Sequence, residues 1–259
     1  MITNVINSVG IYTLSITDKL GRFVVFLGKA LRSLFTTRLK LHKLIVQMNR
    51  IGVESFTIAV LTGTFAGMVF ALQSYIGFQR VGGEQFIGAV VALGLIRELG
   101  PVLTGLMVTG RAGSAIAAEI GTMRITEQID ALRTLRINVY QYLVVPRILA
   151  GTIILPFLTI FAMMCGIIGG YIVCVYVLEL SPDDYITSIK TYVEFADIRG
   201  GLIKAAVFGF ILSWVGTYKG FYTHGGARGV GNATTQSVVT SSILILIANY
   251  FLTKMLERL

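Results

Sequence analysis

Charge is scarce in this sequence. Asp, Glu, Lys and Arg make up 14% of its 259 residues, whereas about 25% is usual in soluble proteins. Hydrophobic residues account for 54%, which indicates an integral membrane protein with one membrane domain and little room for a soluble one. The formal net charge of +9 is spread along the chain and forms no separate basic module. We therefore assign the basic residues to loops near the membrane and expect no nucleic-acid partner.

Residues that build metal and catalytic centres are also few. The two cysteines, Cys165 and Cys174, share one apolar stretch, and the two histidines, His42 and His224, are far apart. We therefore expect no structural disulfide, no metal site and no histidine-based catalytic centre. The sequence contains no GxxxxGK[ST] motif, so we expect no P-loop ATPase in this chain and no cofactor bound by it. An HxxxxD motif is missing as well, which disfavours a lipid-modifying enzyme.

What the sequence does have is long apolar runs, and they predict an all-α, polytopic membrane protein with five transmembrane helices. The third run is about 46 Å long as a helix, so we expect one tilted or extended span that Pro156 could kink. Gly63 and Gly67 have the GxxxG spacing that lets a neighbouring helix approach closely. The predicted spans are Glu54–Arg80, Phe86–Gly110, Ile148–Leu178, Gly200–Gly220 and Ser237–Leu256, with a flexible glycine-rich loop at Phe221–Gln236.

The first 52 residues form a distinct N-terminal region ahead of a transmembrane domain at 53–259. Within it, Leu20–Phe35 predicts an amphipathic helix that lies along the membrane interface, with Arg22, Lys29, Arg32 and Ser33 on one side. The alternative is a first transmembrane helix. Fifteen basic residues fall on the side of the N-terminus and six on the other, leaving out Arg97. The positive-inside rule then places the N-terminus and the 111–147 loop in the cytoplasm and the C-terminus outside.

Two adjacent charges, Arg97 and Glu98, interrupt the second run near its middle. Each costs about 2.5–3.5 kcal/mol at the bilayer centre, so they face either a substrate cavity or a partner in a buried ion pair between helices. Pro101 cannot donate to the carbonyl of Arg97, which predicts a break or opening of the helix there. Lys204 could bind a phosphate headgroup, pair with Glu98, or extend to the interface, and its position alone favours the last of these.

The stretch after these charges is rich in small and polar residues. We expect a cytoplasmic helix there, in a coupling region at about 111–135. Its charged residues are Glu119, Arg124, Glu127 and Asp130. Such a helix either has a merely solvated charged face or docks on a cytoplasmic partner.

The run LGLIRELGPVLTGLMVTGRAGSAIAAEIGTMRITEQIDALRTL, followed by YLVVPRILAG, resembles the MlaE-type permease family. These proteins are membrane subunits of the Mla phospholipid ABC transporter and of related MCE-associated systems. The resemblance extends from the first span to the last. One departure is Arg136-Ile-Asn-Val-Tyr140, which replaces a Gly-Val-Asp-Pro type of turn at the end of the coupling region.

The resemblance implies a non-enzymatic transport subunit that moves phospholipids between the inner and outer membranes and so maintains outer-membrane lipid asymmetry. It implies a homodimer in the inner membrane, with ATP and Mg²⁺ bound by separate cytoplasmic ATPase subunits. A small STAS-domain subunit and a periplasmic, hexameric MCE-domain subunit complete the complex. An outward-open phospholipid pocket would involve Arg97, Glu98, Lys204, Phe70, Gln73 and Phe78, and Glu119–Asp130 would be the coupling helix. The alternatives are an ion-coupled secondary transporter, with Arg97 and Glu98 as the proton site, and an integral-membrane lipid-modifying enzyme.

Overall fold

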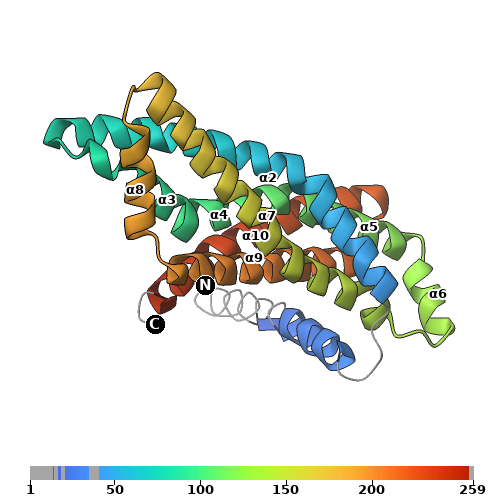
Figure 1. Cartoon of the computed structure of the whole chain (residues 1–259). Coiled ribbons are helices and arrows are strands. Elements are labelled where there is room, and N and C mark those ends of the chain that lie inside the picture. Colours follow the sequence, from blue (N-terminus) through green and yellow to red (C-terminus); the bar gives the residue numbers. More distant parts are fainter. Residues whose placement is uncertain (1–13, 15–16, 19–20, 35–40, 257–259) are drawn as a thin grey trace, which may run out of the picture.

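The fold is a bundle of long helices (Figure 1). The computed structural model describes residues 14, 17–18, 21–34 and 41–256. Within these residues there is no strand, and five helices are long and apolar enough to cross a membrane, which confirms the predicted fold class. They are Leu41–Phe78 (α2), Glu84–Ile125, Tyr140–Val177, Phe195–Phe221 (α9) and Gly226–Leu256 (α10). The second contains α3 (Ile87–Gly94), α4 (Gly100–Val108) and α5 (Ser114–Ile125), and the third contains α7 (Val145–Ile172).

Two short helices lie at opposite ends of the bundle. The helix α6 (Gln128–Thr134) connects the second and third membrane helices at one end, and α8 (Pro182–Tyr192) connects the third and fourth at the other (Figure 1). The first and second membrane helices are joined by a short turn at Gly82, where φ is +66°.

The second membrane helix is much longer than the sequence predicted. It continues 15 residues past the expected end at Gly110 and stops at Ile125, so the polar connection is short, from 126 to 139. The sequence predicted a separate cytoplasmic helix in the polar stretch after Gly110. Arg111 and Glu119 instead form ion pairs with other helices, which keeps this part of the chain helical and packed.

The glycine-rich loop predicted at Phe221–Gln236 is mostly helix, and that prediction was wrong. Only Gly225 and Gly226 have positive φ, at +90° and +66°, and α10 begins at Gly226. The later glycines lie within the first turns of α10, among alanine and threonine residues that are compatible with a helix.

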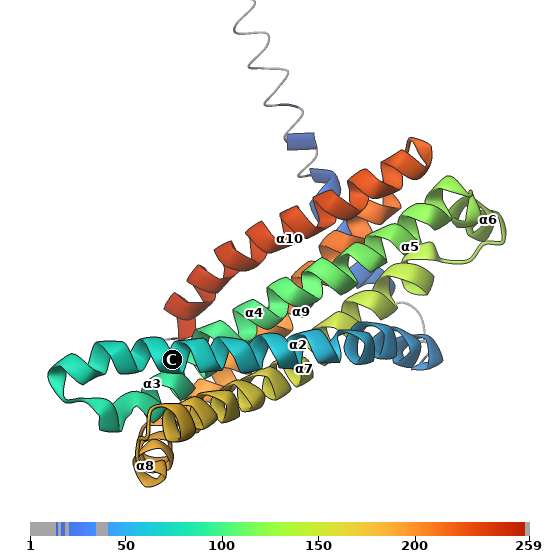
Figure 2. The same ribbon diagram turned by 90° about the horizontal axis from the view of Figure 1, so that it is seen from above.

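The first and third membrane helices run side by side along the bundle (Figure 2). Their contact relies on glycine, as predicted. A Cβ atom on Gly67 would overlap the backbone carbonyl of Gly166, and one on Gly63 would overlap that of Ala162. Backbone therefore packs on backbone along this seam. The helix α2 also runs uninterrupted across residue 52, where the sequence suggested a regional boundary.

Residues 21–34 form a helix that packs on the end of α9. Its anchor is Phe26, which is fully buried among the rings of Tyr140, Tyr218 and Phe221. Arg22, Lys29 and Arg32 are exposed as predicted, but Ser33 is buried and accepts a hydrogen bond from Asn138. The grouping of Ser33 with the basic face was therefore wrong. The predicted ends, Leu20 and Phe35, lie outside the described residues, and the position of this helix relative to a membrane stays a prediction.

Candidate functional site

The helix around the charge pair opens by one residue instead of breaking. Leu95–Leu99 form a π turn between α3 and α4, in which the Gly100 amide donates to the carbonyl of Leu95, five residues back. Such turns are frequent at functional sites, and the described residues contain three more, at Thr109–Gly113, Tyr140–Val144 and Val173–Val177. The predicted opening of the helix at the charge pair is present as this π turn, and the chain remains helical on both sides of Pro101. The carbonyl of Arg97 still lacks the amide donor that Pro101 cannot supply.

Lys204 of α9 supplies a donor in its place. Its Nζ donates to the Arg97 carbonyl at 2.8 Å, to Glu98 Oε1 at 2.6 Å and to Thr253 Oγ1 at 2.7 Å. These bonds use all three hydrogens of the ammonium group. The side chain is only 4% exposed, so the prediction that it extends to the interface was wrong. Gly201, one turn earlier, permits this geometry because a Cβ there would overlap the carbonyl of Ile96.

Glu98 gathers its partners from two helices. Besides Lys204 on α9, Asn249 Nδ2 donates to Glu98 Oε2 at 2.9 Å, and the Thr253 hydroxyl lies 2.9 Å from Glu98 Oε1. Asn249 and Thr253 belong to α10, so this carboxylate joins three membrane helices. It remains 38% exposed, which leaves it accessible from the cavity described below.

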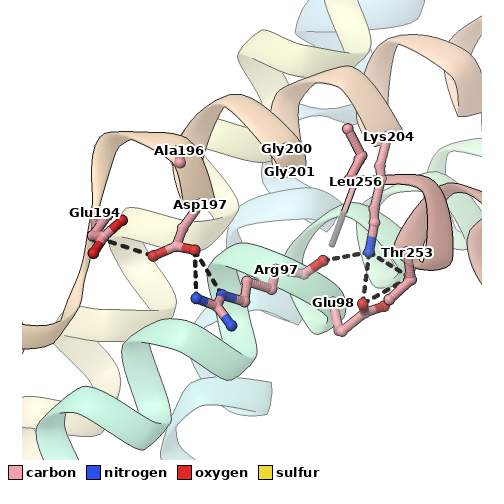
Figure 3. A pocket seen from close by; sticks show the side chains of 10 residues that line it. All are labelled: Arg97, Glu98, Glu194, Ala196, Asp197, Gly200, Gly201, Lys204, Thr253 and Leu256. Carbon is pink, nitrogen blue, oxygen red and sulfur yellow. Dashed lines mark hydrogen bonds and ion pairs between the residues drawn. The ribbon is translucent and has the colours of Figure 1, made fainter. Parts of the chain in front are cut away.

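Arg97 pairs with a carboxylate that the sequence reasoning missed. Its Nε and Nη2 both lie 2.7 Å from Oδ1 of Asp197 (Figure 3). Asp197 is 8% exposed and also accepts the backbone N–H of Glu194, as part of a capping box at the start of α9. The spacing Glu194-x-x-Asp197 before an apolar run could have indicated that helix start. Arg97 itself is 57% exposed, and Nη1 is left for a further acceptor.

A cavity of about 290 Å³ opens beside the two ion pairs (Figure 3). The cavity lies at the start of α9 and the end of α10. Arg97 is 13 residues after Glu84, the first residue of its helix, so the charge pair is closer to one end of the helix than the middle position that the sequence predicted. Both features that the sequence left open are present, since ion pairs tie the helices together and a cavity adjoins them. The lining residues are Arg97, Glu98, Glu194, Ala196, Asp197, Gly200, Gly201, Lys204, Thr253 and Leu256.

Three other predicted pocket residues lie elsewhere on α2. The Phe70 ring lies against Gly94, Gln73 is exposed, and the Phe78 ring lies against Gly83. None of them lines the charged cavity within a single chain.

The predicted coupling residues fall into two groups. Glu119 is 37% exposed and pairs with Arg50 and Arg147 at the end of the bundle. Arg124 instead donates to both oxygens of Asp130, at 2.8 and 2.9 Å, across the turn that leads into α6. Glu127 is exposed and has a positive φ of 59° at that turn. The described residues hold no group of three or more His, Cys, Asp or Glu that could bind a metal.

Five apolar helices that tie charged side chains together beside a cavity are typical of a multi-pass membrane transport protein. The family described as Permease MlaE matches residues 44–255. The chain belongs to this MlaE permease family, as the sequence motifs predicted.

Named relatives agree with this assignment. The chain is 48% identical over 255 residues to a probable ABC transporter permease protein of Rickettsia bellii, with 98% of both chains covered. It is 36% identical over 254 residues to the intermembrane phospholipid transport system permease protein MlaE of Haemophilus influenzae, covering 98% of this chain and 97% of that one. It is 37% identical over 228 residues to the chloroplastic protein trigalactosyldiacylglycerol 1 of Arabidopsis thaliana, covering 88% and 65%. The chain is thus a membrane permease, a transport subunit rather than an enzyme.

Proposed function

We propose that this chain is the permease subunit of an ABC transporter that moves phospholipids between the inner and outer membranes and maintains outer-membrane lipid asymmetry. The Haemophilus relative, whose name specifies intermembrane phospholipid transport, supports the substrate class. The observation that carries the proposal is the charged cavity in an apolar bundle, because a phospholipid combines a charged headgroup with apolar chains. ATP and Mg²⁺ bind to a separate ATPase subunit, in keeping with the missing P-loop motif.

The headgroup phosphate binds at Arg97 in this proposal. Of the two cations in the cavity, Lys204 has already used its three hydrogens, whereas Arg97 is half-exposed and keeps Nη1 for an incoming oxygen. Guanidinium groups suit phosphate oxygens well. Glu98 and Lys204 form the polar wall. Phe70, Gln73 and Phe78 contact the lipid beyond the cavity, in a pocket shared by two copies of the chain.

The complex around the chain consists of a homodimer in the inner membrane, two cytoplasmic ATPase subunits, a small STAS-domain subunit and a hexameric MCE-domain subunit on the periplasmic face. The N-terminus lies in the cytoplasm and the C-terminus in the periplasm, which the excess of basic residues on the N-terminal side supports. In this orientation α6 faces the cytoplasm, and α8 at the other end of the bundle faces the periplasm (Figure 1). The charged cavity, which is lined by the start of α9 just after α8, then lies toward the periplasm.

In this proposal the turn before α6 couples ATP hydrolysis to lipid movement. The ATPase receives this turn, with Arg124 and Asp130 holding its shape and Glu127 exposed to the partner. Closure of the ATPase on ATP then pushes the second membrane helix, on which Arg97, Glu98 and Pro101 lie. Reversing the charges of Arg124 and Glu127 together should uncouple ATP hydrolysis from lipid movement, and normal transport in that variant would contradict this step.

The test begins with purification of the tagged chain from its own cells, which should bring down an ATPase. In proteoliposomes that complex should move a fluorescent phospholipid only when ATP is present. Arg97→Gln should reduce that transfer, whereas Arg80→Gln, an exposed residue outside the cavity, should not. Transport by a preparation without a nucleotidase, driven by an ion gradient, would overturn the proposal in favour of a secondary transporter.

A further inference from the structure

A network of ion pairs at the α6 end of the bundle centres on one carboxylate. Glu119 of α5 accepts from Nη1 of Arg50 on α2 at 2.8 Å through Oε1. Its other oxygen, Oε2, lies 2.9 Å from Nη2 of Arg147 on α7. One side chain therefore links three membrane helices. The Glu119 side chain is 37% exposed, but both of its oxygens are engaged within the chain, whereas Glu127 is exposed and forms no ion pair within the described residues.

Arg147 depends on this carboxylate. Its side chain is 4% exposed, and Nη1 donates to the carbonyl of Leu143 at 2.7 Å. Its Nε has no hydrogen-bond partner within the described chain. Glu119 is the single carboxylate that pairs with it there, whereas Arg50 is half-exposed and can also be hydrated. A buried charge that loses its partner is strongly unfavourable, so Arg147 holds α7 to α5 only while Glu119 is ionised.

A second attachment lies two turns earlier on the same helix. Arg111 donates to the backbone carbonyl of Arg50 and to Ser55 Oγ, each at 3.1 Å, and pairs with Glu54. The second membrane helix is thus fixed to α2 at two positions along its length. The three short motifs Gly110-Arg-Ala-Gly-Ser, Ala118-Glu-Ile-Gly and Val145-Pro-Arg each supply one member of the network.

The network sits between the coupling turn and the cavity. Glu119 is six residues before the end of α5 and on the same continuous helix as the π turn at Leu95–Leu99, about 30 Å away along the axis. Movement of α6 reaches the cavity only if the end of α5 does not slide or swing against its neighbours.

We propose that Glu119 is a positioning residue for coupling. Through Arg50 and Arg147 it clamps the end of α5 to α2 and α7, so that displacement of α6 moves the three helices together and reaches the cavity. This inference rests on the proposed function. It revises the coupling helix Glu119–Asp130 that the family resemblance implied, since Glu119 acts inside the permease and does not touch the ATPase.

The test compares lipid transferred per ATP hydrolysed by the complete complex in proteoliposomes. Glu119→Gln preserves the size of the side chain and removes its charge. It should assemble with the ATPase and hydrolyse ATP, while the transfer ratio falls by about tenfold, a typical size for coupling between two sites. Glu84→Gln is the matched control, because Glu84 begins the same helix at its other end and has no ion pair within the described chain. Its ratio should equal that of the wild type.

A double variant separates coupling from simple stabilisation. Glu119→Gln with Arg147→Met removes the unpaired buried charge, and replacing a whole buried ion pair by apolar groups is often neutral for stability. The melting temperature lost in Glu119→Gln should therefore return, while the transfer ratio stays low. A double variant that regains both, or that cannot assemble, would show that the network serves the fold alone and would overturn the inference. So would a normal ratio in Glu119→Gln. Lack of ATP-driven transfer in the wild type would instead refute the proposed function.

Discussion

Lys204 connects α9 to the second membrane helix and to α10 beside the charged cavity, and Lys204→Met tests its contribution to stability. The substitution keeps the length of the side chain and removes the ammonium group. Three hydrogen bonds are lost at once, to the Arg97 carbonyl, to Glu98 and to Thr253. The first loss is the most specific, because Pro101 has already removed the amide that would otherwise satisfy that carbonyl.

The expected cost follows from these contacts. Removing one partner of a buried ion pair costs about 3–5 kcal/mol. The Glu98 side chain is 38% exposed and keeps Asn249 as a donor, so hydration offsets part of the loss. We expect about 2–3 kcal/mol. For a chain of this length 1 kcal/mol shifts the melting temperature by about 2–4 °C, so Lys204→Met should lower it by roughly 5–10 °C.

Thermal unfolding of the purified chain in detergent, followed by intrinsic fluorescence, measures this shift. Lys190→Met is the control, since Lys190 is exposed on α8 and its loss should leave the melting temperature unchanged. Adding Glu98→Gln to Lys204→Met should recover part of the loss, because the amide no longer needs a counter-charge but can still bond Asn249. A melting temperature in Lys204→Met equal to that of Lys190→Met would refute the reasoning.

Two further predictions concern other contacts of the bundle. Gly67→Val should destabilise the fold by about 3 kcal/mol, because its side chain would overlap the backbone of Gly166, whereas Gly77→Val, with open space around it, should be close to neutral in the same melting assay. Arg97→Gln should lower the free energy of unfolding by about 1 kcal/mol more than Asp197→Asn, because it leaves a buried carboxylate without a counter-charge. Asp197→Asn leaves a half-exposed guanidinium that water can solvate. The reverse order of the two melting temperatures would contradict the burial argument.

The sequence alone was enough to place the five membrane helices, because an uncharged run of about 20 residues has few other structures open to it. It was not enough to predict where these helices end. The sequence predicted that the second membrane helix ends near Gly110 and that a separate cytoplasmic helix carries Glu119. Arg111 and Glu119 instead form ion pairs with α2 or α7, and these partners are distant in sequence. Whether a polar residue lies in a packed helix or in a loop depends on its tertiary partners, and local periodicity in the sequence does not reveal these partners.

The same dependence on partners that are distant in sequence explains which residues of the charged cavity were predicted and which were missed. The neighbouring charges Arg97 and Glu98 were correctly expected to need partners, and Lys204 was among the candidates. Asp197 was not, because it lies 100 residues from Arg97 in an acidic stretch, and no local sequence pattern links the two. Its role became visible only when α8 and the capping box at Glu194 placed it beside the π turn. The pocket role of Phe70, Gln73 and Phe78 remains a prediction that depends on a second copy of the chain.

The π turn shows what backbone chemistry can predict and where it stops. Because residue 101 is a proline, the Arg97 carbonyl lacks its usual amide donor. The sequence does not predict that Lys204 donates a hydrogen bond to this carbonyl instead. Pro101→Ala tests whether that exchange is essential. Replacing an interior proline usually relieves a helix, and Pro156→Ala in α7 should do so by giving the Thr152 carbonyl a donor. In Pro101→Ala the new amide instead competes with Lys204 and favours an α turn that rotates Arg97 away from its partner. We therefore expect Pro101→Ala to melt lower than Pro156→Ala. If it melts as high or higher, the ammonium group is a substitute for the missing amide and not the reason for the turn.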